Sequence, residues 1–153
     1  MRDTTKYQGI IPAFYACYDE EGNISTKGVE DLTHYLVKKG VKGVYVGGSS
    51  GECIYQSVEE RKIVLEHVVK AAEGKLTIIA HVACNNTKDS KVLAAHAESL
   101  GVDAIAAIPP IYFQAFYGIT ALSTQLLQAE EYYKLQNLYL VLLMKKEISA
   151  LKA

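Results

Sequence analysis

Short apolar runs alternate along the chain with longer segments in which apolar residues recur every three or four positions. Four runs are rich in β-branched residues and begin near Ile10, Gly43, Leu76 and Asp103. They read GIIPAFYAC, GVYVGG, LTIIAHVAC and DAIAAIPPIYF. Their starts lie about 30 residues apart, the length of one strand-and-helix unit. The pattern predicts α/β architecture with a parallel sheet, as a (β/α) barrel or a doubly wound sheet.

Three helices are predicted between these runs from their first and last residues. Ser25 precedes the first apolar stripe, and Ser57 with Glu60 forms a capping box before the second. Thr87 is in a position to cap the third helix. A glycine follows each stripe and is expected to end the helix: Gly40, Gly74 and Gly101.

The chain beyond Phe113 follows a different pattern. Residues 1–113 are predicted to form the amino-terminal half of a (β/α) barrel, and residues 114–153 a divergent, mostly helical segment. A long helix is expected from about Ala121 to Lys134. The run LYLVLLM after it fits either a fifth strand or the end of a helix.

Composition narrows the class of protein and its partners. The chain has 153 residues, 50% hydrophobic and 22% charged, with a net charge of −1, as expected for one globular domain. The absence of a basic excess argues against nucleic acid, and the acidic amino terminus against a signal peptide or membrane span. Cys17, Cys53 and Cys84 lie too far apart for common metal or disulfide motifs, which predicts reduced thiols, no metal site and a cytoplasmic location.

The segment YVGGSSGECIY, residues 45–55, is the candidate site. Loops after the carboxyl ends of parallel strands carry the chemistry of such folds, and bare glycine backbone lets an anion approach. Ser49 and Ser50 would then hold a carboxylate or phosphate. From spacing alone, a simple turn whose serines satisfy local backbone groups is the more common explanation of such a segment. Neither GxGxxG nor the Walker pattern is present, so no nucleotide cofactor is predicted.

Four ordered segments, TKYQGIIPAFYACYDEEGNIS, KGVYVGGSSGECIYQSVEER, LTIIAHVACNNTKDS and GVDAIAAIPPIYF, carry a family resemblance. Over residues 6 to 113 the chain resembles the amino-terminal half of the N-acetylneuraminate lyases, in the family that includes dihydrodipicolinate synthase. The resemblance implies a (β/α)8 TIM barrel, here reduced to about four βα units and a divergent helical segment. It also implies class I aldolase chemistry without a cofactor: reversible cleavage of N-acetylneuraminate to pyruvate and N-acetylmannosamine.

The resemblance also assigns roles to the loop. It implies that Ser49 and Ser50 bind the carboxylate of the pyruvoyl part, within a supporting loop formed by Gly47, Gly48, Gly51 and Glu52. Glu52 follows Gly51 at an expected helix start. We therefore expect it to accept backbone N–H groups rather than to act as a base.

The catalytic segments of the family are not found. The family places its Schiff-base lysine in a GxK(D/N)SS-like segment and its catalytic tyrosine in a YNxP-like segment, and neither is present. The chain is therefore expected to be a truncated, inactive lyase. Lys42 and Lys75 precede strands, and Lys88 lies in a first helical turn, all poor places for a desolvated amine. Lys145 and Lys146 are the least unfavourable candidates.

Two further residues invite a functional interpretation. Tyr112 corresponds to a family tyrosine at a subunit interface that supports the proton relay of a neighbouring subunit, or else it is a packed aromatic at a strand end. His81 is better explained as a hydrogen-bonded histidine of the barrel interior than as a base, because no catalytic partner is spaced near it.

Three functions remain open from the sequence. The chain is the first half of a lyase-family enzyme, a noncatalytic binding or assembly module, or a different pyruvate-dependent aldolase such as dihydrodipicolinate synthase. The expected ligand is a small carboxylate, pyruvate or sialic acid, and no nucleic acid or membrane partner is predicted. An open half-barrel would leave apolar surface exposed, so self-association into a homo-oligomer is predicted.

Overall fold

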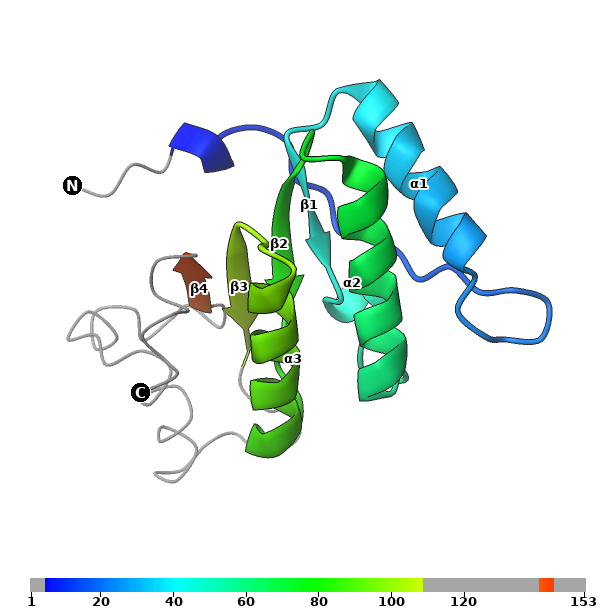
Figure 1. The fold of residues 1–153 in the computed structure, drawn as a ribbon, viewed down its shortest axis with the longest axis vertical. Helices are drawn as coiled ribbons and strands as arrows, with labels where there is room; N and C mark the ends of the chain where they lie inside the picture. Colours follow the sequence, from blue (N-terminus) through cyan, green and yellow to red (C-terminus); the bar gives the residue numbers. More distant parts are fainter. Residues whose placement is uncertain (1–4, 109–140, 145–153) are drawn as a thin grey trace.

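The computed structural model describes residues 5–108 and 141–144, and Figure 1 shows them as helices packed on a sheet. Three strands run parallel in the order β1 (Gly43–Val46), β2 (Thr77–His81) and β3 (Ala104–Ala107). A fourth strand, β4 (Val141–Met144), pairs with β3 in the antiparallel direction. The predicted parallel α/β arrangement is confirmed for β1 to β3, whereas β4 departs from it.

Figure 1 shows the three long helices side by side on one face of the sheet, with α2 between α1 and α3. The helical segments of the described chain are η1 (Thr5–Tyr7), α1 (Thr26–Lys39), η2 (Ser49–Gly51), α2 (Val58–Ala72) and α3 (Thr87–Ser99). Each of α2 and α3 connects two neighbouring parallel strands. This places the residues that follow β1, β2 and β3 at one edge of the sheet.

The N-caps of these helices follow the sequence with one exception. Ser25 accepts a hydrogen bond from the Gly28 N–H at 3.1 Å, and the capping box of Ser57 and Glu60 is complete. The prediction that Thr87 caps α3 is wrong, because Asn86 does so. Asn86 has the extended backbone of an N-cap residue, and its amide oxygen accepts the Asp89 N–H at 2.8 Å.

The first predicted strand lies beside β1 without forming a regular strand. The Phe14 N–H donates to the Tyr45 carbonyl at 2.8 Å, and the Tyr45 N–H donates to the Pro12 carbonyl at 2.9 Å. A single parallel bridge joins Ala13 to Tyr45. Pro12 can accept but has no N–H to donate, which explains why this run makes only partial sheet pairing.

The core lies on both faces of the parallel strands. Val44 on β1 and Ile105 on β3 pack with helix residues such as Val29 and Val68, all at most 1% exposed. On the other face, a smaller cluster contains Ile79, Ala104 and Ala106, with Tyr7, Ile11 and Tyr45 packed against it. Strands buried on both faces are typical of parallel sheets, as the continuous apolar runs predicted.

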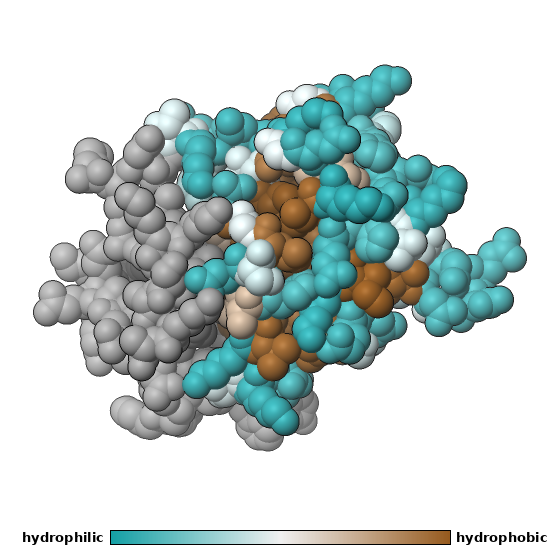
Figure 2. Space-filling model, in the orientation of Figure 1, coloured by the Kyte–Doolittle hydropathy of each residue, from teal (hydrophilic) through white to brown (hydrophobic). Residues whose placement is uncertain are grey.

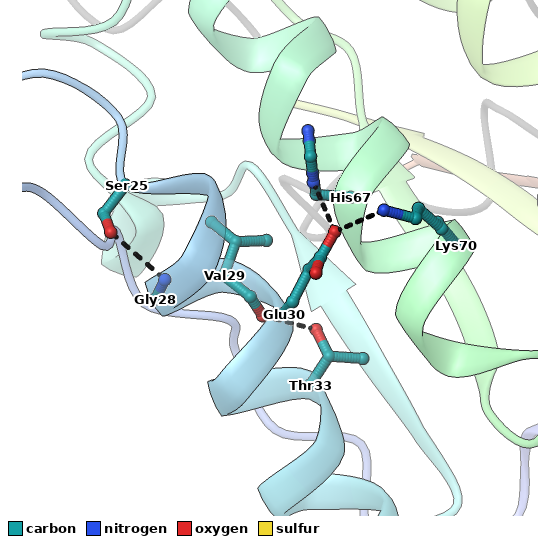
Figure 3. A network of polar contacts seen from close by, with 7 residues as sticks. All are labelled: Ser25, Gly28, Val29, Glu30, Thr33, His67 and Lys70. Atoms are coloured by element: carbon teal, nitrogen blue, oxygen red, sulfur yellow. Dashed lines mark hydrogen bonds and ion pairs between the residues drawn. The ribbon is translucent and has the colours of Figure 1, made fainter.

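Polar side-chain contacts join the helices at their surface. Glu30 on α1 binds both His67 and Lys70 of α2, each at 2.8 Å, as Figure 3 shows. Glu66 on α2 contacts His96 on α3 at 2.7 Å. Figure 2 shows hydrophilic residues over most of the described surface on this side, with apolar residues visible between them. None of the helices within the described ranges is long and apolar enough to cross a membrane.

Three sequence predictions concern the carboxy-terminal part. The helix expected from Ala121 to Lys134 lies outside the described residues, and the division at residue 113 stays a prediction. In the run LYLVLLM, Val141–Met144 forms β4, so these residues take the strand alternative.

Candidate functional site

The glycine and serine loop leaves the carboxyl end of β1. Gly47 has a φ of +71°, and the chain then forms η2, in which the Gly51 N–H donates to the Gly48 carbonyl at 2.9 Å. Ser49 and Ser50 are both exposed at the start of this turn. The structure therefore presents two hydroxyl groups at the carboxyl edge of the sheet, where the sequence placed a carboxylate site.

Two glycines of the loop lie where neighbouring atoms leave no room for a side chain. A Cβ atom on Gly48 would lie 2.5 Å from Cε1 of Tyr45, and one on Gly51 would lie 2.7 Å from the Phe14 carbonyl oxygen. Both distances are too short for real carbon contacts. Burial raises the pKa of Tyr45 to about 12, so its hydroxyl stays protonated at neutral pH. The bare backbone thus lets the loop pack closely on Tyr45 and Phe14.

Glu52 lies at the end of the turn rather than at the start of α2. Its φ is +58°, its side chain is exposed, and its backbone N–H donates to the Ser49 carbonyl at 3.0 Å. The expectation that Glu52 begins a helix is wrong, because α2 starts at Val58. The loop support that the structure shows comes from the backbone of Glu52.

His81 lies at the end of β2 and is 5% exposed. Its Nδ1 lies 2.8 Å from the Gly47 carbonyl oxygen, so this side chain contacts the loop directly. Burial, aided by the positive charge of Arg61, lowers the pKa of His81 to about 4. The prediction of a hydrogen-bonded interior histidine is confirmed, and such a low pKa makes it a weak base at neutral pH.

Arg61 is a site residue that the sequence analysis missed. It lies on α2, is 6% exposed, and donates to the carbonyls of His81 at 2.7 Å and Ala83 at 2.9 Å. It also donates to the Cys84 sulfur at 3.2 Å. A charged residue in an amphipathic helix normally lies on the solvent-exposed face. Only the spacing of Arg61, three and four residues before Val64 and Leu65 and so on the apolar face of α2, could have suggested that it is buried.

A cavity of about 250 Å³ opens beside these residues. Its lining combines the loop after β1 with the loop after β2 and includes Cys53, Arg61, His81, Cys84 and Asn85. In the described part of the chain it does not reach the two serines. The three cysteines of the chain are free thiols, as the sequence predicted, and burial raises the pKa of Cys53.

The described lysines lie in positions that do not suit Schiff-base chemistry. Lys42 and Lys75 are exposed before β1 and β2, and Lys88 is exposed in the first turn of α3. Within residues 5–108 every lysine is exposed except Lys62, which is half-buried and pairs with Glu59 at 2.7 Å. These lysines therefore lack the desolvated environment that a Schiff-base amine requires.

Three predicted site residues lie outside the described residues: Tyr112, Lys145 and Lys146. Their proposed roles, an interface relay for Tyr112 and Schiff-base chemistry for the lysines, stay predictions. The structure brings together Gly47, Gly48, Ser49, Ser50 and Gly51 in one loop, and adds His81 and Arg61 to its support.

The chain is similar to known sialic acid aldolases. It is 80% identical over 113 residues to the N-acetylneuraminate lyase of Mediterraneibacter gnavus, a match that covers 74% of this chain and 36% of the relative. The solved structure of a Ruminococcus gnavus sialic acid aldolase, a catalytic lysine mutant, superposes with a TM-score of 0.78 at 76% identity. That match covers 80% of this chain and 40% of the solved one.

A more distant structure gives the same result. The N-acetylneuraminate lyase of Mycoplasma synoviae, 33% identical, superposes with a TM-score of 0.76 over 80% of this chain and 43% of that one. The chain therefore spans less than half the length of these relatives. The sequence profile of the dihydrodipicolinate synthetase family matches residues 6–131. With the parallel βα units and the loop after β1, this match shows that the chain is a partial (β/α) barrel belonging to the dihydrodipicolinate synthetase family.

Proposed function

We propose that Ser49 and Ser50 bind the carboxylate of a 2-keto acid, as part of a protein of the N-acetylneuraminate lyase type. One observation carries this proposal: the exposed serine pair lies on a glycine turn at the carboxyl edge of the sheet, inside a segment 80% identical to an N-acetylneuraminate lyase. The substrate class follows from the names of the relatives. The ligand is pyruvate or the pyruvoyl part of sialic acid.

The geometry of the loop supports anion binding. Both serine side chains are exposed, so their hydroxyls can donate to a ligand without first losing a buried partner. The neighbouring carbonyls of Gly48 and Ser49 accept the N–H groups of Gly51 and Glu52 at 2.9 and 3.0 Å, which holds the turn that presents the two serines. Hydroxyl donors to a carboxylate form charge-assisted hydrogen bonds, which are stronger than neutral ones.

The proposal is tested by titrating pyruvate into the protein, followed by NMR. Each of Ser49→Ala and Ser50→Ala should weaken binding by about 1.5–3 kcal/mol, roughly tenfold or more, because one hydrogen bond to a charged acceptor is lost. Ser99→Ala at the end of α3 is the matched control, since Ser99 is also exposed but lies outside the loop. Equal affinity in wild type and in the double alanine variant would reject the site.

Catalysis by the described residues is not part of the proposal. Aldol cleavage needs a desolvated lysine facing the carboxylate site, and the lysines of residues 5–108 are solvated or paired. We therefore expect binding without cleavage of N-acetylneuraminate, the behaviour of a noncatalytic module. Incubation with pyruvate and borohydride followed by intact-mass measurement tests this. A stoichiometric adduct on one lysine would contradict it, and Lys145 and Lys146 would be mapped first.

Self-association and a cytoplasmic location complete the proposal. Ile10, Ile54 and Tyr55 are 73%, 56% and 80% exposed, which leaves apolar surface for a second copy to cover. The proposed cytoplasmic location rests on the three free thiols, which are typical of proteins in reducing compartments. Sedimentation should give a dimer or larger species at micromolar concentration, and a monodisperse monomer would count against association.

A further inference from the structure

A buried histidine from the neighbouring strand holds the first peptide of the serine loop. His81 Nδ1 lies 2.8 Å from the carbonyl oxygen of Gly47, where β1 ends and φ is +71°. The Gly47 carbonyl and the Gly48 N–H belong to one rigid peptide plane. Fixing this carbonyl therefore fixes the direction in which the chain enters η2 and places Ser49.

This hydrogen bond selects one tautomer of His81. A carbonyl oxygen can only accept, so the proton must lie on Nδ1. With a pKa of about 4 the ring is neutral at pH 7, and Nε2 then carries no proton. Nε2 is buried and has no hydrogen-bond partner among the residues that the structure describes. The ring therefore contacts the loop through one polar group, the Nδ1–H that donates to the Gly47 carbonyl.

Arg61 holds His81 in turn. Its guanidinium donates to the His81 carbonyl at 2.7 Å, and Arg61 directly follows Glu60, the last residue of the capping box that begins α2. The same guanidinium lies 3.4 Å from Nδ1, which already carries its proton toward Gly47, so Arg61 acts on His81 through the backbone and through its charge. A continuous set of contacts therefore joins α2, the end of β2 and the end of β1.

We infer that His81 is a positioning residue for the carboxylate site: its Nδ1–H orients the Gly47 peptide and thereby sets where the hydroxyls of Ser49 and Ser50 lie. The link to the carboxylate rests on the function proposed above, while the control of the loop rests on the contacts alone. A histidine that only filled space would need no donor at Nδ1.

Two variants of His81 separate these roles. In His81→Asn the amide nitrogen replaces Nδ1 and can still donate to Gly47. In His81→Gln the nitrogen lies farther along the side chain, near the place of Nε2, although glutamine matches the volume of histidine better. A positioning role predicts that Asn restores the loop and Gln does not, whereas a packing role predicts the reverse order.

Two measurements are made on the full chain of each variant. The first is amide hydrogen exchange at Gly51 and Glu52, whose N–H groups are bonded to Gly48 and Ser49. The second is the pyruvate dissociation constant. We expect both to change about tenfold in His81→Gln, the size of one lost hydrogen bond, and by less than about threefold in His81→Asn.

The outcomes are distinguishable. Unchanged exchange in His81→Gln, or better rescue by Gln than by Asn, would overturn the positioning role. Exchange that follows the donor while wild type binds no pyruvate would uphold control of the loop and reject the proposed function and its link to His81. Parallel changes in exchange and affinity would support both.

Discussion

The two ends of the sheet are held by different kinds of polar contact. At the carboxyl end, His81 and Arg61 are 5% and 6% exposed and bond to backbone carbonyls. At the amino end, the Nζ of Lys6 pairs with Asp103 at 3.0 Å, and the two side chains are 44% and 33% exposed. The first set is buried and faces the loop; the second is open to water.

This difference predicts which end tolerates change. A buried carbonyl that loses its donor carries the full desolvation cost, whereas an exposed ion pair is screened by water and salt. We therefore expect the backbone to be positioned most precisely at the carboxyl end, where (β/α) barrels carry their chemistry. The amino end is expected to contribute mainly to stability. The predictions below test this contrast from the largest expected effect to the smallest.

Arg61→Ala should have the largest effect. It removes donors to the carbonyls of His81 and Ala83 and leaves space where the guanidinium packed. We expect the free energy of unfolding to fall by about 3–5 kcal/mol, measured by urea denaturation. Lys62→Ala is the matched control, because Lys62 is the next residue of α2, is only half-buried, and pairs with the exposed Glu59. It should cost less than about 1 kcal/mol. Similar losses of unfolding free energy in both variants would show that the buried contacts of Arg61 matter no more than the ion pair of Lys62 with Glu59.

The pH dependence of stability should report the burial of His81. Its pKa is about 4 in the folded protein and about 6.5 when unfolded, so the unfolded state binds the extra proton first as the pH falls. Stability is therefore complete above pH 6.5 and falls by about 3 kcal/mol between pH 6.5 and 4.

The control for this effect is His81→Asn, which keeps a donor and cannot titrate. Carboxylates with lowered pKa, such as Glu30 and Glu60, lose their contributions in both proteins at lower pH. The difference between wild type and variant isolates His81. A difference that stays constant from pH 7 to pH 4 would show that His81 does not titrate as a buried group.

Gly48→Ala should have an intermediate effect. Its Cβ would lie 2.5 Å from the ring of Tyr45, so the half-buried tyrosine or the loop must move. We expect a loss of about 1–3 kcal/mol in stability. The test is a double-mutant cycle with Tyr45→Val, in which Gly48→Ala should become milder because the ring is gone. If the stability losses of the two single variants simply add in the double variant, the clash with the Tyr45 ring is not the cause.

Much of the fold could be predicted because local signals agreed with the tertiary structure. The capping box at Ser57 and Glu60 formed as expected, and the apolar runs at Val44 and Ile79 became strands buried on both faces. Asn86 was missed as a cap because three cap-forming residues stand together at 85–87, and only the backbone decides between them.

The candidate site was predictable as a loop but not as a set of contacts. Ser49 and Ser50 follow a strand directly, so their place at the carboxyl edge follows from the chain order. The bonds from His81 to Gly47 and from Arg61 to His81 join residues 34 and 20 positions apart. No periodicity encodes such pairings, because they depend on the register between β1 and β2 and on the packing of α2. The antiparallel direction of β4 is likewise a tertiary property.

Lys6→Ala should have the smallest effect. Lys6 connects η1 to Asp103, and the hydrogen bond with Asp103 raises the pKa of Lys6. A raised pKa means that the contribution is present below pH 10.5 and is lost as the pH rises through the folded value. Because the pair is solvent-exposed, we expect a loss of at most about 1 kcal/mol, which 1 M salt should largely abolish.

Asp103→Ala is the informative partner of that change. The same carboxylate accepts the Ile78 N–H at 2.8 Å, so its removal also leaves a strand amide without its acceptor. This variant should cost roughly 1–2 kcal/mol more than Lys6→Ala, and the excess should persist in 1 M salt. If Lys6→Ala instead matched Arg61→Ala in urea denaturation, the amino end would be as tightly determined as the carboxyl end. In that case the buried residues His81 and Arg61 would not position the loop after β1 more precisely than exposed contacts do.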